Sequence, residues 1–191
     1  DGWFDAEMYR STEEQINPYY SLINDTAYYF LTWNSNFDNS RITQINDSDF
    51  TGLENVDYFW KDTLIDYTAR FLQGNTDCEY ITGEGYHDNQ SLAVGGTVAK
   101  QYVLDNIYAS GPAATIAFAI SGFSDNLHHL NVHVNDQLIL DSTYYGRISL
   151  KHQADISSSI LQETTTFAFT SIDDDPVNAN TDYSAINFVR L

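Results

Sequence analysis

The sequence has little positive charge, and it lacks a long hydrophobic run. It holds 8 Lys and Arg against 27 Asp and Glu, which gives a formal net charge of −19. A surface of this sign cannot neutralise phosphates, so nucleic acid is excluded as a partner. The longest apolar segment, 113–123, is broken by Thr115, Ser121 and Gly122. The sequence therefore predicts no membrane-spanning segment.

Cysteine is nearly absent as well. The single cysteine, Cys78, excludes an internal disulfide and cannot alone form a zinc site. Its acidic neighbours, Asp77 and Glu79, disfavour the thiolate that a cysteine nucleophile requires. The Gly-x-Ser-x-Gly turn of serine hydrolases is missing. His129 and His133 would share one strand face but lie about 13 Å apart, too far for one zinc ion.

Apolar and aromatic residues are nevertheless plentiful, at 42% and 15% of the 191 residues. A chain of this length buries roughly 70% of its unfolded surface, so one domain is expected. Short runs rich in β-branched and aromatic residues, with a turn about every 8–12 residues, are typical of a sandwich or barrel. These runs lie at 98–108, 115–122, 130–134, 138–140, 146–150, 166–170 and 185–191.

The clearest strand lies at 130–135, where apolar and polar residues alternate. The apolar members would face a core and the polar members would face solvent. Asn135 and Asp136 follow, and both residue types tolerate the positive φ of a tight turn. The sequence therefore predicts a hairpin that joins this strand to 138–140.

The N-terminal half is less regular. Residues 1–17 are expected to form a connector, and 18–191 a single domain in which 18–97 is irregular. A β-rich run at 27–33 predicts a strand. Over 56–71 apolar residues recur every three or four positions, which predicts one short helix. The many aromatic residues of the same stretch leave a strand as the competing interpretation. The expected fold is mainly β, a jelly-roll-like β-sandwich with one short helix.

Oxygen ligands gather towards the C-terminus. The stretch 173–182 holds Asp173, Asp175, Asn178 and Asp182, and carboxylate and amide oxygens are the ligands that Ca²⁺ prefers. The residue order of an EF-hand loop is absent. Two interpretations stay open, a structural calcium site at these four residues and an acidic hairpin tip in solvent.

Exposed aromatic residues beside amides would suit a sugar, because rings stack on sugar faces and amides bond hydroxyl groups. Tyr144 and Tyr145 lie next to a predicted hairpin and are the candidate stacking residues. Most other aromatic residues must pack in the core. A stand-alone carbohydrate-binding β-sandwich with a polysaccharide partner is therefore one predicted function.

The stretch 17–33, Asn-Pro-Tyr-Tyr-Ser-Leu-Ile-Asn-Asp-Thr-Ala-Tyr-Tyr-Phe-Leu-Thr-Trp, is the most distinctive motif in the chain. Gly-Glu-Gly-Tyr follows it at 83–86, and the hairpin at 130–136 and a closing stretch at 182–188 come later. In this order the motifs resemble the N-terminal, non-catalytic jelly-roll module of gingipain-like cysteine peptidases that are linked to the type IX secretion system.

This resemblance implies a module of a secreted, periplasmic or outer-membrane-associated protein of the Bacteroidota type. Its partner would be a peptidase domain further along the same polypeptide, against which the module packs or to which it presents protein substrate. The family's cysteine and histidine dyad lies in that separate domain, and Cys78 is not in its setting. No catalytic residue carries over, so we expect that this chain is not an enzyme.

Overall fold

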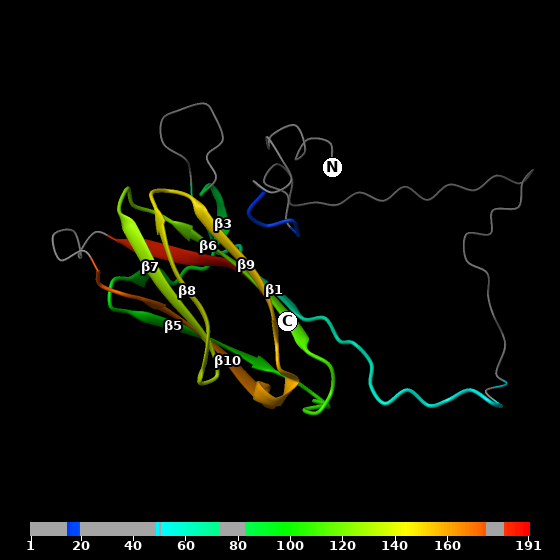
Figure 1. Ribbon diagram of the computed structural model, residues 1–191. Coiled ribbons are helices and arrows are strands. Elements are labelled where there is room, and N and C mark those ends of the chain that lie inside the picture. Colours follow the sequence, from blue (N-terminus) through cyan, green and yellow to red (C-terminus); the bar gives the residue numbers. More distant parts are fainter. Residues whose placement is uncertain (1–14, 20–48, 50, 73–82, 175–181) are drawn as a thin grey trace, which may run out of the picture.

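Two antiparallel β-sheets packed face to face form the domain (Figure 1). The computed structural model describes residues 15–19, 49, 51–72, 83–174 and 182–191. The five-stranded sheet contains β1 (Leu64–Asp66), β11 (Tyr183–Arg190), β6 (Ala114–Gly122) and β9 (Ser149–Ile156) in that order, with β4 (Leu92–Ala93) also paired to β11. The four-stranded sheet has the order β5 (Thr97–Val103), β10 (Thr164–Ser171), β7 (Leu127–Val134) and β8 (Gln137–Tyr145). The predicted β-sandwich is confirmed.

A two-stranded ribbon and one short helix complete the described elements. The ribbon pairs β2 (Arg70–Leu72) with β3 (Gly85–His87), and the helix is a single 3-10 turn, η1 (Ser158–Ile160). Within the described ranges, no helix is long and apolar enough to cross a membrane. The strand expected at 27–33 and the single cysteine, Cys78, lie outside those ranges.

Alternating apolar residues place one face of each sheet in a shared core. In β7, Leu130, Val132 and Val134 are buried, as their alternation predicts. Phe169 of β10 and Phe118 of β6 meet edge to face across the sheets, with ring centroids 5.5 Å apart. Burial of one such side chain contributes about 1.5–3 kcal/mol. Hydrophobic packing therefore holds the two sheets together.

The predicted hairpin joins β7 to β8, and it is also fixed to β10. Asn135 adopts φ +52°, the left-handed conformation that a tight turn requires. Its main-chain N donates to Thr166 O at 2.7 Å, and its side-chain Oδ1 accepts from Thr166 N at 2.9 Å. The asparagine thus serves both the turn and the neighbouring strand.

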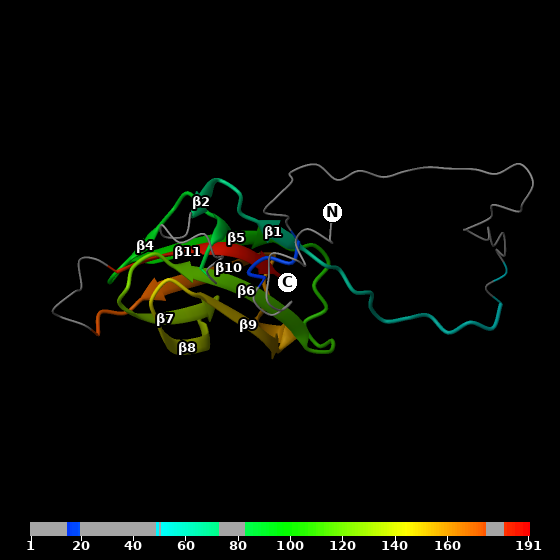
Figure 2. The ribbon, with the colours of Figure 1, turned by 90° about the horizontal axis from the view of Figure 1, so that it is seen from above.

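The outer face of the five-stranded sheet is covered by N-terminal parts of the chain. Ile16 is buried against Ala119 and Phe188. Asn187 of β11 donates through Nδ2 to the main-chain O of Tyr86 in β3 at 2.8 Å. Figure 2 shows β2 of the ribbon and β8 of the other sheet on opposite sides of the sandwich. The end of the expected connector therefore packs on the sheet.

The helix predicted over 56–71 is wrong. Residues 51–63, cyan in Figure 1, approach β1 from outside the two sheets, and the next three residues form β1 itself. Pairing with β11 gives the backbone of β1 hydrogen-bond partners, and Ile65 and Tyr67 pack against the core. These contacts are with residues far along the chain, so a local apolar spacing cannot reveal them.

Gly122 ends β6 where His128 of the other sheet approaches closely. A Cβ at this position would lie 2.5 Å from His128 Nε2 and 2.7 Å from the main-chain O of Gly146. We expect Gly122→Ala to lower the free energy of unfolding by about 1–3 kcal/mol, the usual cost of overpacking. Urea denaturation measures this change. Ala99→Val, which adds carbon at an exposed position of β5, is the control and should change it by less than about 0.5 kcal/mol.

Candidate functional site

A groove with a volume of about 440 Å³ opens at the end of the sandwich where β11 ends. Its lining comes chiefly from three places along the chain. One wall is the segment 58–63, the other is the loop 104–112 between β5 and β6, and Arg190 and Leu191 lie with them. Residues far apart in the sequence therefore build a single site.

The first wall is attached to the end of β11. Thr63 N donates to Leu191 O at 2.7 Å, and Leu191 N donates to Thr63 O at 2.9 Å. Arg190 donates from Nη2 and Nε to the two carboxylate oxygens of Asp62 at 2.6 and 2.9 Å. This bidentate contact holds the pKa of Asp62 below its ordinary value. Arg190 Nη1 also donates to the hydroxyl of Tyr19 at 2.8 Å.

The second wall is a tight loop that presents Tyr108. Leu104 N donates to Glu163 O at 2.8 Å, and Gly111 N donates to Tyr108 O at the same distance. A Cβ on Gly111 would lie 2.8 Å from the ring of Tyr108, so only glycine allows this close approach. Asn106 adopts φ +56°, a conformation that asparagine tolerates.

Two contacts join the walls across the groove. Lys61 Nζ lies 3.5 Å from Asp105 Oδ2. The rings of Tyr58 and Tyr108 stack with centroids 6.1 Å apart. Because side chains of one wall already contact the other, the groove is formed without a ligand.

Aromatic rings in the groove face solvent. Tyr58 is 43% exposed, Phe59 71%, Trp60 67% and Tyr108 44%. Large apolar side chains gathered in one exposed place mark a site of interaction. The groove is therefore the candidate ligand-binding site of this chain.

The two tyrosines that the sequence singled out lie elsewhere. Tyr144 is buried, its ring stacks on His128 with centroids 4.6 Å apart, and its hydroxyl bonds Ser184 Oγ at 2.8 Å. A buried, stacked ring cannot present a face to a sugar, contrary to the expectation for Tyr144. Tyr145 follows it on the other face of β8 and is exposed, and its role as a sugar contact stays a prediction.

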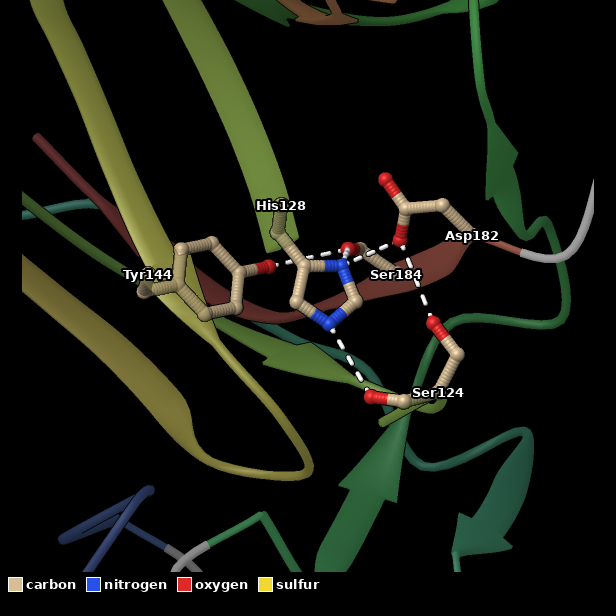
Figure 3. Close-up of polar contacts among 5 residues, drawn as sticks. All are labelled: Ser124, His128, Tyr144, Asp182 and Ser184. Atoms are coloured by element: carbon tan, nitrogen blue, oxygen red, sulfur yellow. Dashed lines mark hydrogen bonds and ion pairs between the residues drawn. The ribbon is translucent and has the colours of Figure 1, made fainter. Parts of the chain in front are cut away.

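A cluster of polar side chains lies buried at the other end of β11 (Figure 3). His128 Nδ1 forms an ion pair with Asp182 and lies 3.3 Å from Ser184 Oγ. His128 Nε2 lies 3.3 Å from the main-chain O of Ser124. His128 belongs to one sheet and Ser184 to the other, so these polar contacts tie the two sheets together at this end.

Serine, histidine and aspartate also form hydrolase triads, but the arrangement here differs. A nucleophilic serine bonds the ring nitrogen that will take its proton. Ser124 Oγ instead donates to Asp182 Oδ1 at 3.4 Å. Ser184 Oγ does face His128, but it is buried and shares that nitrogen with the aspartate. The geometry is that of a buried structural network.

The residues predicted to bind calcium fall into two groups. Asp175 and Asn178 lie outside the described residues. Asp173 is exposed, whereas Asp182 is buried with Oδ1 against His128. In the described part of the chain, no group of three or more His, Cys, Asp or Glu residues could hold a metal ion. Because two of the four residues lie outside the described ranges, the four-residue calcium site stays a prediction.

His129 lies on the outer face of the four-stranded sheet, opposite in direction to its neighbour His128. Its Nε2 lies 2.6 Å from Asp141 Oδ1, and its Nδ1 contacts Asp174. The hydrogen bond to Asp141, followed by that to Asp174, raises the pKa of His129. The histidine thus links the chain just after β10 to strands β7 and β8.

Comparison with protein-family models and with curated proteins finds no match. Among solved structures, the CBM36-1 domain of a multidomain xylanase from the hindgut metagenome of Trinervitermes trinervoides has 9% identity and a TM-score of 0.41, over 68% of this chain and 95% of that domain. A carbohydrate-binding module CBM36 in complex with calcium and xylotriose has 9% identity and a TM-score of 0.40, over 66% and 97%. Dimeric latent PorU from Porphyromonas gingivalis has 11% identity and a TM-score of 0.46, over 68% of this chain and 12% of that one. The likeness is one of β-sandwich fold.

The raised pKa of His129 sets a direction for the dependence of stability on pH. The protonated ring stabilises the fold fully below the unfolded pKa of about 6.5, and this contribution is lost as pH rises through the folded pKa. We therefore expect His129→Gln to lower the melting temperature more at pH 5.5 than at pH 9. Asp141→Asn should give the same pattern, because it removes the main cause of the shift. Equal losses at both pH values would contradict this assignment.

Proposed function

We propose that the groove binds a polysaccharide and that this chain is a non-catalytic, carbohydrate-binding β-sandwich module. The observation that carries this proposal is the gathering of the exposed rings of Tyr58, Phe59, Trp60 and Tyr108 in one groove. Aromatic rings offer flat apolar faces to the C–H faces of sugars. A ligand that covers them gains about 25 cal/mol per Å² of apolar surface removed from water.

Polar side chains line the same groove. Asn106, Thr115 and Gln153 are exposed there. An amide group both donates and accepts hydrogen bonds, which matches a sugar hydroxyl that does the same. Rings for stacking and amides for hydrogen bonding are thus available together, as polysaccharide recognition requires.

Contacts that join the two walls of the groove reduce the entropy cost of binding. The Lys61–Asp105 pair and the Tyr58–Tyr108 stack hold the walls near each other before a ligand arrives. Binding then costs less conformational entropy than it would between free segments.

Trp60→Ala tests this function. We expect it to weaken polysaccharide binding at least about tenfold, or about 1.4 kcal/mol, because it removes a large exposed ring from the groove. Isothermal titration calorimetry with a panel of plant and cell-surface polysaccharides measures the affinity. Tyr183→Ala is the matched control, since Tyr183 is an exposed aromatic residue at the opposite end of β11. No heat with any polysaccharide would overturn the proposal.

A second candidate function is that of a module ahead of a gingipain-like peptidase domain, in a secreted, periplasmic or outer-membrane-associated protein. Its support is that residues of the shared motifs have structural roles here. Asn17 donates through Nδ2 to Asp66 and accepts at Oδ1 from Tyr19 N at 2.9 Å. Gly83 leaves no room for a side chain, because a Cβ would lie 2.5 Å from Arg147 O. Asn17 and Gly83, two described residues of these motifs, thus contact β1 and the turn between β8 and β9.

The mass of the native polypeptide tests this second function. An antibody raised against the domain should detect, in the source cells or their medium, a band several-fold heavier than the 21.7 kDa of this chain. Mass spectrometry of that band should then find peptides of a peptidase domain. A band near 21.7 kDa would contradict the peptidase connection.

A further inference from the structure

The charged side chains that line the groove are matched in number and paired. Two cations, Lys61 and Arg190, face two anions, Asp62 and Asp105. Arg190 is held by both oxygens of Asp62, and Lys61 lies against Asp105. The side chains of the described lining therefore sum to zero charge, although the whole chain carries −19.

This pairing disfavours a charged ligand of either sign. An anionic polymer would meet cations that already have partners, and the negative charge of the whole chain would repel it. A cationic polymer would have to displace Lys61 from Asp105 or Arg190 from Asp62. An uncharged polymer needs neither step and still covers the aromatic rings.

Resting on the carbohydrate-binding function proposed above, we propose that the groove selects uncharged polysaccharides and that the Lys61–Asp105 pair determines this selection. The two side chains are 50% and 71% exposed, so a ligand in the groove can reach them. They come from opposite walls, and the charge of either one is balanced only by its partner across the groove. Arg190 is 44% exposed, but unlike Lys61 it already donates to both carboxylate oxygens of Asp62 and to the hydroxyl of Tyr19.

Ligand pairs that share a backbone and differ in charge test the selection. Suitable pairs are methyl-esterified and de-esterified homogalacturonan, chito-oligosaccharide and its deacetylated form, and hydroxyethyl and carboxymethyl cellulose. Where the neutral member of a pair binds, an anionic member should bind at least about tenfold more weakly at low salt. A cationic member is also attracted by the −19 charge of the chain, so it should bind more weakly than its neutral partner once salt screens that attraction. Binding of the neutral member should change less than about twofold between low and high salt, because no ion pair forms with it.

Two variants test whether the Lys61–Asp105 pair determines the selection for uncharged polysaccharides. Asp105→Asn leaves Lys61 without its carboxylate, so the ratio of anionic to neutral affinity should rise about threefold to tenfold at low salt. Asp125→Asn is the matched control. Asp125 is equally exposed, lies 3.4 Å from the Nε of Arg147, and is absent from the groove lining. It removes the same charge, so a change confined to Asp105→Asn identifies the groove pair.

The outcomes separate this inference from the function on which it rests. If no polysaccharide of any charge binds, the carbohydrate-binding function fails and the selection fails with it. If neutral and charged members bind equally well, or if Asp125→Asn changes the ratio as much as Asp105→Asn does, polysaccharide binding stands and the selection by the Lys61–Asp105 pair is overturned.

Discussion

The pairing of β11 with β6 in the middle of the five-stranded sheet is the interaction on which the other features depend. β11 also pairs with β1 and β4, and its Ile186 and Val189 enter the core. Asp182, just before the strand, reaches the buried histidine cluster. Arg190, its last residue, fixes one wall of the groove. One strand therefore positions a structural network at one end of the sandwich and the candidate binding groove at the other.

Polar groups are buried at one end of this strand, whereas apolar rings are exposed at the other. At the first end, His128, Asp182 and Ser184 are buried, and each has polar partners, which satisfies the requirement for burying such groups. At the second end, Phe59 and Trp60 keep most of their surface in water. The first arrangement is explained by stability alone. The second leaves large rings exposed in the groove, which is why the groove is the candidate binding site.

Local patterns predicted the features that depend on neighbouring residues. Alternation and the two turn residues Asn135 and Asp136 located the β7–β8 hairpin, because face and φ are decided within a few residues. The groove depends on contacts between segments such as 58–60 and Tyr108, which no local pattern encodes. Three consecutive aromatic residues at 58–60 were the available signal. The spacing of apolar residues over 56–71 led to a helix prediction instead, although one helix face cannot bury three adjacent rings.

β11 comes after all of its partner strands in the sequence, and this order affects how the domain folds. Arg190 and Asp62 are 128 residues apart, and the strand pairings of β11 span from 62 residues (Ser184 with Gly122) to 126 residues (Arg190 with Leu64). Contacts of such separation form late and slowly, because a long loop must close first. Until β11 is synthesised, β6 has an unpaired edge, which is a site of aggregation. The groove wall at 58–63 is attached to this strand, so the wall forms only after the strand docks.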